Sequence, residues 1–110
     1  MSNVTYEGGV FGNRPVKLTT TSVTDIVNEG KRCVVKKLYV TEISGNTPNF
    51  SLEIYDGTTS FYLMNTKPMT ARQTLEWGDI PLNQNQKLRA TAGTANRIDV
   101  IAVIVEPGQG

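Results

Sequence analysis

The stretch that most constrains the fold is residues 31–43, KRCVVKKLYVTEI, which contains neither glycine nor proline and is rich in β-branched and aromatic residues. Read at a period of two, it places apolar side chains on both faces of a strand. One face carries Val34, Leu38 and Val40, and the other carries Cys33, Val35 and Tyr39. Because a strand that is apolar on both faces is normally covered on both sides, the stretch is predicted to be a central strand of a β-sandwich.

Short β-rich runs make up the rest of the chain, and turn signals separate them at roughly eight to twelve residues, a spacing typical of all-β folds. The clearest run is residues 50–55, in which Phe50, Leu52 and Ile54 alternate with Ser51, Glu53 and Tyr55. Asp56-Gly57 then predicts a hairpin. No segment keeps a helical period over three turns. We therefore expect an all-β fold, a single antiparallel β-sandwich of about eight strands that is jelly-roll-like.

The two ends of the chain are expected to lie outside this domain. Residues 1–14 contain Gly8, Gly9 and Gly12 and only scattered apolar side chains, so an extended N-terminal arm is expected there. The arm residues expected to contact its own domain or a neighbouring subunit are Val4, Tyr6, Val10 and Phe11. A frayed terminus is the alternative interpretation. The sandwich is expected to span residues 15–106, with Pro15 opening its first strand, and residues 107–110 to form a C-terminal tail.

The chain carries nearly equal numbers of basic and acidic residues, which argues against some classes of binding partner. The chain has 11 Lys and Arg against 10 Asp and Glu, whereas a protein that binds nucleic acid by neutralising phosphates carries an excess of basic residues. No apolar run approaches the length of a membrane span. The N-terminus also lacks the basic and apolar regions of a signal peptide. We therefore expect neither a nucleic acid nor a membrane as a partner.

The sequence offers no grouping of residues that supports catalysis. It has no histidine and one cysteine, Cys33, so a nucleophilic side chain would lack the usual general base. The carboxylates are scattered rather than clustered as metal ligands are. No glycine-rich segment matches a P-loop or a dinucleotide-binding motif. We expect a protein that is not an enzyme and has no metal or cofactor; a carboxylate pair meeting in a deep cleft would favour an enzyme instead.

The last expected strand, residues 97–105, is apolar on both faces. One face carries Ile98, Val100, Ala102 and Ile104, and the other carries Ile101, Val103 and Val105. Together with Val35 and Tyr39, the second face is larger than a two-layer sandwich needs, and soluble monomers rarely leave such a patch open. We therefore expect a homo-oligomer, a trimer as the first expectation. Its interface would contain Val35, Tyr39, Ile101, Val103 and Val105. The N-terminal arm is the alternative cover for this face.

Several motifs follow one another in a set order over residues 16–106. They are Asn28-Glu29-Gly30-Lys31-Arg32, Phe50-Ser51-Leu52-Glu53-Ile54, Asp56-Gly57-Thr58-Thr59, Thr74-Leu75-Glu76, Ile80-Pro81-Leu82 and a final apolar strand. This order resembles that of the small β-sandwich virion proteins of tailed bacteriophages. The resemblance implies a structural role in many copies on a virion, after synthesis in the cytoplasm of the host bacterium. Its partners would be the major capsid protein or other virion proteins. The first expectation is a capsid decoration (cement) protein, and a neck, tail or fibre component is the alternative.

A function of another class, a small carbohydrate-binding module, rests on exposed aromatic residues. A sugar ring could pack on a platform that uses Tyr55, Tyr62 or Trp77. Trp77 is in phase with Leu75, which also suits it to packing in the core. The two tyrosines equally suit contacts with cross-strand neighbours.

Overall fold

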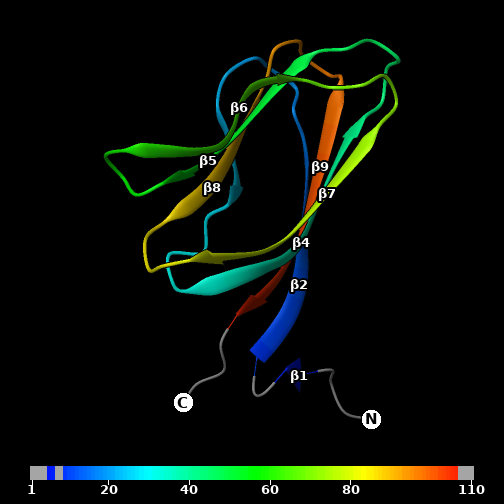
Figure 1. The fold of residues 1–110 in the computed structure, drawn as a ribbon. Coiled ribbons are helices and arrows are strands. Elements are labelled where there is room, and N and C mark those ends of the chain that lie inside the picture. The colour runs from blue at the N-terminus through cyan, green and yellow to red at the C-terminus, as the bar shows by residue number, and fades with distance from the viewer. Residues whose placement is uncertain (1–4, 7–8, 107–110) are drawn as a thin grey trace.

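The computed structural model describes residues 5–6 and 9–106 of the 110-residue chain, with side chains from residue 12 onward. These residues contain no helix and form nine strands (Figure 1). The strands are β1 (Thr5–Tyr6), β2 (Gly9–Lys17), β3 (Thr24–Val27), β4 (Cys33–Glu42), β5 (Asn49–Tyr55), β6 (Ser60–Pro68), β7 (Thr74–Leu82), β8 (Lys87–Ala92) and β9 (Ile98–Glu106). No described segment is a helix that could cross a membrane.

The strands form two antiparallel sheets, ordered β1-β2-β9-β4-β7 and β3-β8-β5-β6. Each strand from the first half of the chain pairs with its counterpart from the second half: β2 with β9, β3 with β8, β4 with β7 and β5 with β6. Nested antiparallel pairs wrapped into two facing sheets are the topology of a jelly roll. The expected all-β, jelly-roll-like sandwich is therefore confirmed, with the two-residue β1 added at one edge.

The core lies between the two sheets and is filled by alternate residues of their strands. On β9 the inward residues are Ile98, Val100, Ala102 and Ile104, as the alternation of the sequence predicts. β4 lies between β9 and β7, so the expected central strand is also confirmed. Phe50 and Leu52 of β5 meet this layer from the other sheet and are fully buried.

β4 contains a β-bulge, and the residues before it face the opposite side of the sheet from the one that the sequence predicted. The register of β4 against β9 shifts between Val35 and Lys37. One inserted residue moves every side chain before it to the opposite face of the sheet. Val35, expected at the interface, is therefore 0% exposed in the core, and Cys33 is buried beside it. Val34 takes the outward position instead.

The register of β7 against β4 stays constant along the strand. The side chains of β7 therefore switch faces opposite the bulge, as those of β4 do. Its inward residues are Leu75 and Trp77 before the change and Ile80 and Leu82 after it. The change falls at Gly78 and Asp79, and Asp79 has a φ of 55°. A Cβ on Gly78 would lie 3.0 Å from the carbonyl oxygen of Lys36. The missing side chain therefore lets the two strands approach closely at the bulge.

β2 crosses the expected boundary between arm and domain at residues 14 and 15. It pairs with β9 from Val10 opposite Glu106 to Lys17 opposite Asp99, and Figure 1 shows the two strands side by side. Pro15 therefore lies inside the strand and does not open it. The N–H of Leu18 donates to the carbonyl oxygen of Ile98. Successive backbone nitrogens of a strand point alternately toward and away from its partner, so the nitrogen of Pro15 points away from β9. Its missing N–H therefore costs no hydrogen bond between the two strands.

None of the four side chains named for the N-terminal arm is among those that the structure describes. Val4 falls in the undescribed part of the chain, as does the tail at residues 107–110. Tyr6, Val10 and Phe11 are placed by their backbone alone, in β1 and β2. Their expected contacts stay predictions.

Candidate functional site

The outer face of the β1-β2-β9-β4-β7 sheet carries the first candidate surface. Four of the five expected interface residues lie there, namely Tyr39, Ile101, Val103 and Val105. The register places Pro15, Ile101 and Tyr39 side by side on β2, β9 and β4. Ile101 is 41% exposed, and Tyr39, Val103 and Val105 are half-buried. We call these four residues with Pro15 and Val34 the apolar outer face.

Charged side chains surround the apolar outer face, and they neutralise one another in ion pairs. Lys17 Nζ lies 2.6 Å from Asp99 Oδ1, and Lys37 Nζ lies 3.1 Å from Glu76 Oε1. At the bulge, Lys36 Nζ lies 2.7 Å from Asp79 Oδ1, and this hydrogen bond lowers the pKa of the Asp79 carboxyl. An apolar centre with a polar rim is the arrangement found in protein–protein interfaces.

Two shallow depressions flank the apolar outer face at its opposite ends. One, of about 210 Å³, lies beside Pro15 and Ile101. The other, of about 280 Å³, lies beside Val34 and Pro81. Both are lined by residues of strands in the same sheet or directly beside them, some facing outward and some belonging to the core.

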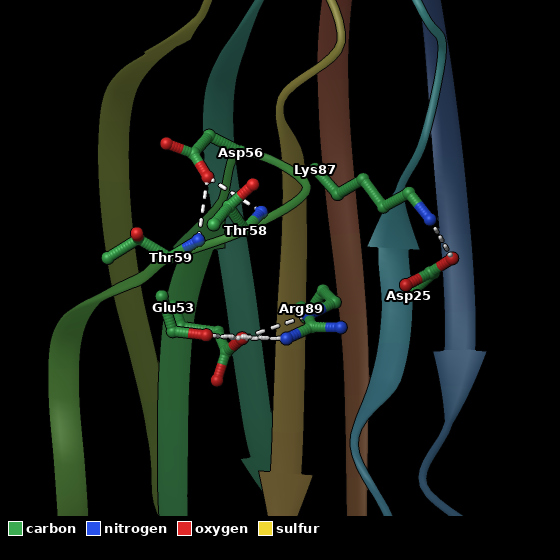
Figure 2. A network of polar contacts seen from close by, with 8 residues as sticks. Asp25, Glu53, Asp56, Thr58, Thr59, Lys87 and Arg89 are labelled. Carbon is green, nitrogen blue, oxygen red and sulfur yellow. Dashed lines mark hydrogen bonds and ion pairs between the residues drawn. The ribbon is translucent and has the colours of Figure 1, made fainter.

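The outer face of the β3-β8-β5-β6 sheet is different in character. The register places Asp25, Arg89, Glu53 and Tyr62 next to one another across the four strands. We call these four residues the polar row. Figure 2 shows Arg89 reaching Glu53 within this row, with Asp25 bound to Lys87 beside it. All of these side chains point away from the core.

A carboxylate–guanidinium pair lies at the centre of the polar row. Arg89 Nε donates to Glu53 Oε2 at 2.9 Å, and Arg89 Nη2 donates to the same oxygen. The Ser60 hydroxyl also donates to Glu53 Oε2, at 2.8 Å. The Arg89 guanidinium in turn stacks on the ring of Tyr55, 3.7 Å from its centroid. Glu53 is only 5% exposed although it faces outward, because its neighbours in the sheet cover it.

The three expected aromatic residues do not come together. Tyr55 and Tyr62 lie on the outer face of the four-stranded sheet, on neighbouring strands. Trp77 lies in β7 of the other sheet and packs, half-buried, against the core. Trp77 therefore packs against the core, as the alternative interpretation expected, and only the two tyrosines share a face. Sequence reasoning correctly placed Glu53 on the outward phase of β5, but it gave no signal that Arg89 lies opposite.

Glu42 is a buried carboxylate at the end of β4 that the sequence analysis did not single out. Its oxygens accept hydrogen bonds from the N–H of Gly45 at 2.8 Å, the N–H of Arg72 at 2.9 Å, and the N–H and hydroxyl of Ser44. Burial alone would raise the pKa of Glu42, but these hydrogen bonds outweigh burial and lower it to about 2. The carboxylate thus joins the loop after β4 to the loop before β7.

The described residues contain no group of three or more side chains suited to hold a metal ion. Cys33 is buried in the core, and burial raises the pKa of its thiol. A thiol of this kind packs as a small apolar side chain.

The likeness of this chain to known proteins is one of fold. No protein-family model matches the sequence, and no curated protein matches it. A crystal structure of a pentameric capsid protein from metagenomic phage sequences superposes with a TM-score of 0.50, at 19% identity over 87% of this chain. A second crystal structure of such a protein gives a TM-score of 0.49 at 20% identity. The chain spans 64% and 60% of the length of those two chains.

A third solved structure is the virus-like particle of the extra small virus of the giant freshwater prawn Macrobrachium rosenbergii. It matches 94% of this chain and 82% of its own at 9% identity, with a TM-score of 0.45. At such low identities the likeness at a TM-score of 0.50 shows a shared fold only, because one fold hosts many functions.

Proposed function

We propose that the protein is a non-enzymatic structural component of a virus particle, and that it assembles with copies of itself through the apolar outer face. The observation that carries this proposal is the set of Tyr39, Ile101, Val103 and Val105, which stay partly exposed on the outside of a complete sandwich. Burying such a set against a neighbour removes apolar area from water and stabilises the assembly.

The fold supports a place in the virion by analogy. Jelly rolls occur in viral capsids, but also in lectins and cupins, so the fold alone does not decide between them. The neighbour with a TM-score of 0.50 is a pentameric capsid protein from phage sequences. A structural role in a virus particle is also what the apolar outer face and the resemblance to phage virion proteins favour.

Within the virion we propose a capsid decoration (cement) protein first, and a neck, tail or fibre component as the alternative. A cement protein binds the major capsid protein in its folded form and so stabilises the shell by mass action. Adding the purified protein to phage heads that lack it should raise the temperature at which the heads release DNA. Heads that neither bind the protein nor gain thermal resistance would count against the cement role.

The symmetry of the oligomer depends on what the apolar outer face meets. Two copies that use the same face would form a closed dimer, whereas a trimer or larger ring needs the face to meet a different surface of the next copy. A trimer is our first expectation. Val103 lies on β9, between β2 and β4 in the sheet, so it would be buried in either arrangement.

Val103→Asp tests the interface without disturbing the protomer. A carboxylate buried between subunits is costly, whereas in the free protomer the side chain would stay hydrated beside Lys37, its cross-strand neighbour. Light scattering after size exclusion should show an oligomer for the native protein and a monomer for the variant. Circular dichroism and a thermal melt would show that the variant is still folded.

Thr91→Asp is the matched control, because Thr91 is also half-buried and outward-facing but lies on the other sheet, in β8. It should leave the oligomer intact. If Val103→Asp stays assembled, or if both variants dissociate, the proposed interface is wrong. A native protein that is monomeric both in solution and on particles would refute self-assembly altogether.

A further inference from the structure

The polar row on the four-stranded sheet is a second surface, separate from the apolar outer face. It combines an exposed aromatic ring with a fixed carboxylate and a fixed guanidinium on neighbouring strands. We propose that it is a binding site for an uncharged saccharide, with Tyr62 as the stacking platform and Glu53 and Arg89 as the polar anchors. This proposal does not depend on self-assembly, which is proposed from the apolar outer face on the opposite side of the molecule.

Tyr62 supplies the platform. It is 53% exposed and lies directly opposite Glu53 in the register of β5 and β6. Side chains in such a pair have Cβ atoms about 4.5–5.5 Å apart, so a ring stacked on Tyr62 reaches the carboxylate beside it. β6 is the edge strand of its sheet, which leaves the ring open to a ligand. One face of a pyranose ring carries C–H groups that pack on an aromatic ring, and its rim carries hydroxyls.

Glu53 and Arg89 are held in place before any ligand binds. Glu53 Oε2 takes the hydrogen bonds from Arg89 and Ser60. Oε1 accepts no hydrogen bond, and Arg89 Nη1 donates none, within the described part of the chain. Tyr55 fixes the plane of the guanidinium by stacking. Each of the two groups therefore keeps one atom without a hydrogen-bond partner, and both have little conformational entropy left to lose, which favours binding.

The charges of this surface select an uncharged ligand. Glu53 is paired with Arg89, and Asp25 lies 3.5 Å from Lys87 Nζ, so both cations at the row are neutralised by a carboxylate. Anionic polymers are drawn to surfaces with an excess of positive charge, which is not present here. A neutral polyol gains hydrogen bonds from such a surface without needing to displace an ion pair.

Phe61 provides a control on the same strand. It is 54% exposed, almost the same as Tyr62, but it lies opposite Ile54, whose side chain packs against the core. Phe61 therefore points to the other side of the sheet. A ligand that uses the polar row should sense the loss of Tyr62 and ignore the loss of Phe61.

The test is a titration of the full-length protein with maltohexaose, cellohexaose and chitohexaose, with hexagalacturonate as the acidic comparison. Amide NMR shifts would report both the affinity and the place of binding. We expect at least one neutral hexasaccharide to shift amides of β5, β6 and β8. Tyr62→Ala should weaken that binding about tenfold, as expected for loss of one aromatic contact, and Phe61→Ala should change it by less than about twofold.

Three results would overturn the proposal. The first is no binding of any neutral hexasaccharide at about 10 mM, where even a weak site with a Kd near 1 mM would be occupied. The second is binding that Tyr62→Ala leaves unchanged, or that Phe61→Ala weakens equally. The third is preferential binding of hexagalacturonate. A result of this kind would leave the assembly through the apolar outer face untouched, because Val103→Asp tests that separately.

Discussion

Replacing Arg89 by methionine should destabilise the fold strongly, although Arg89 lies on the outside of a sheet. The substitution keeps most of the length of the side chain but removes the guanidinium. It leaves Glu53, which is 5% exposed, with the Ser60 hydroxyl as its one remaining hydrogen-bond donor among the described residues. A carboxylate in this position would be largely out of water and would have lost the cation that is paired with it.

The size of the effect follows from burial. Removing one partner of a buried ion pair costs about 3–5 kcal/mol, because the other charge stays buried without compensation. Loss of the stacking of Arg89 on Tyr55 adds about 0.5–1 kcal/mol. A domain of this size is stable by about 5–15 kcal/mol in total. Since a loss of 1 kcal/mol lowers the Tm of such a chain by roughly 4 °C, the Tm should fall by about 14–24 °C.

Urea unfolding followed by circular dichroism measures this loss, and two further variants show its cause. Glu53→Gln should cost less than Arg89→Met, because the Arg89 side chain is 18% exposed and can turn toward water. The double variant Glu53→Leu with Arg89→Met should recover most of the stability, because apolar residues can replace a buried ion pair at little cost. A loss below about 1 kcal/mol for Arg89→Met is typical of an exposed salt bridge and would refute this account of the pair.

Two other residues make separate predictions. The pKa of Glu42 is lowered from 4.5 to about 2, so its contribution to stability is complete above pH 4.5 and is lost as the pH falls toward 2; urea unfolding across this range should show the loss, and Glu42→Gln should flatten it. Thr66 is β-branched with a φ of 54°, so Thr66→Asn should raise the stability by about 0.5–1 kcal/mol in the same assay, whereas a loss would mean that the Thr66 backbone is not strained.

The fold class could be predicted from the sequence because strand alternation is a local property. The apolar residues of β5 and β9 repeat at a period of two, and this period fixed both their inward sets and the outward position of Ile101, Val103 and Val105. Turn residues such as Asp56-Gly57 marked where strands end. Because short antiparallel strands can pack in only a few ways, a sandwich could then be predicted.

What the sequence did not determine are the features that depend on pairing between distant strands. The bulge at Lys36 and Lys37 exists because β4 is one residue longer than β9 at this level, and it moved Val35 from the expected interface into the core. Pro15 fits within β2 because its nitrogen points away from β9. The polar row joins residues as far apart as Asp25 and Arg89, and β3 pairing with β8 brings these together. Local alternation decides which face a side chain takes within an unbroken strand, whereas tertiary pairing decides where the phase breaks and which charges meet.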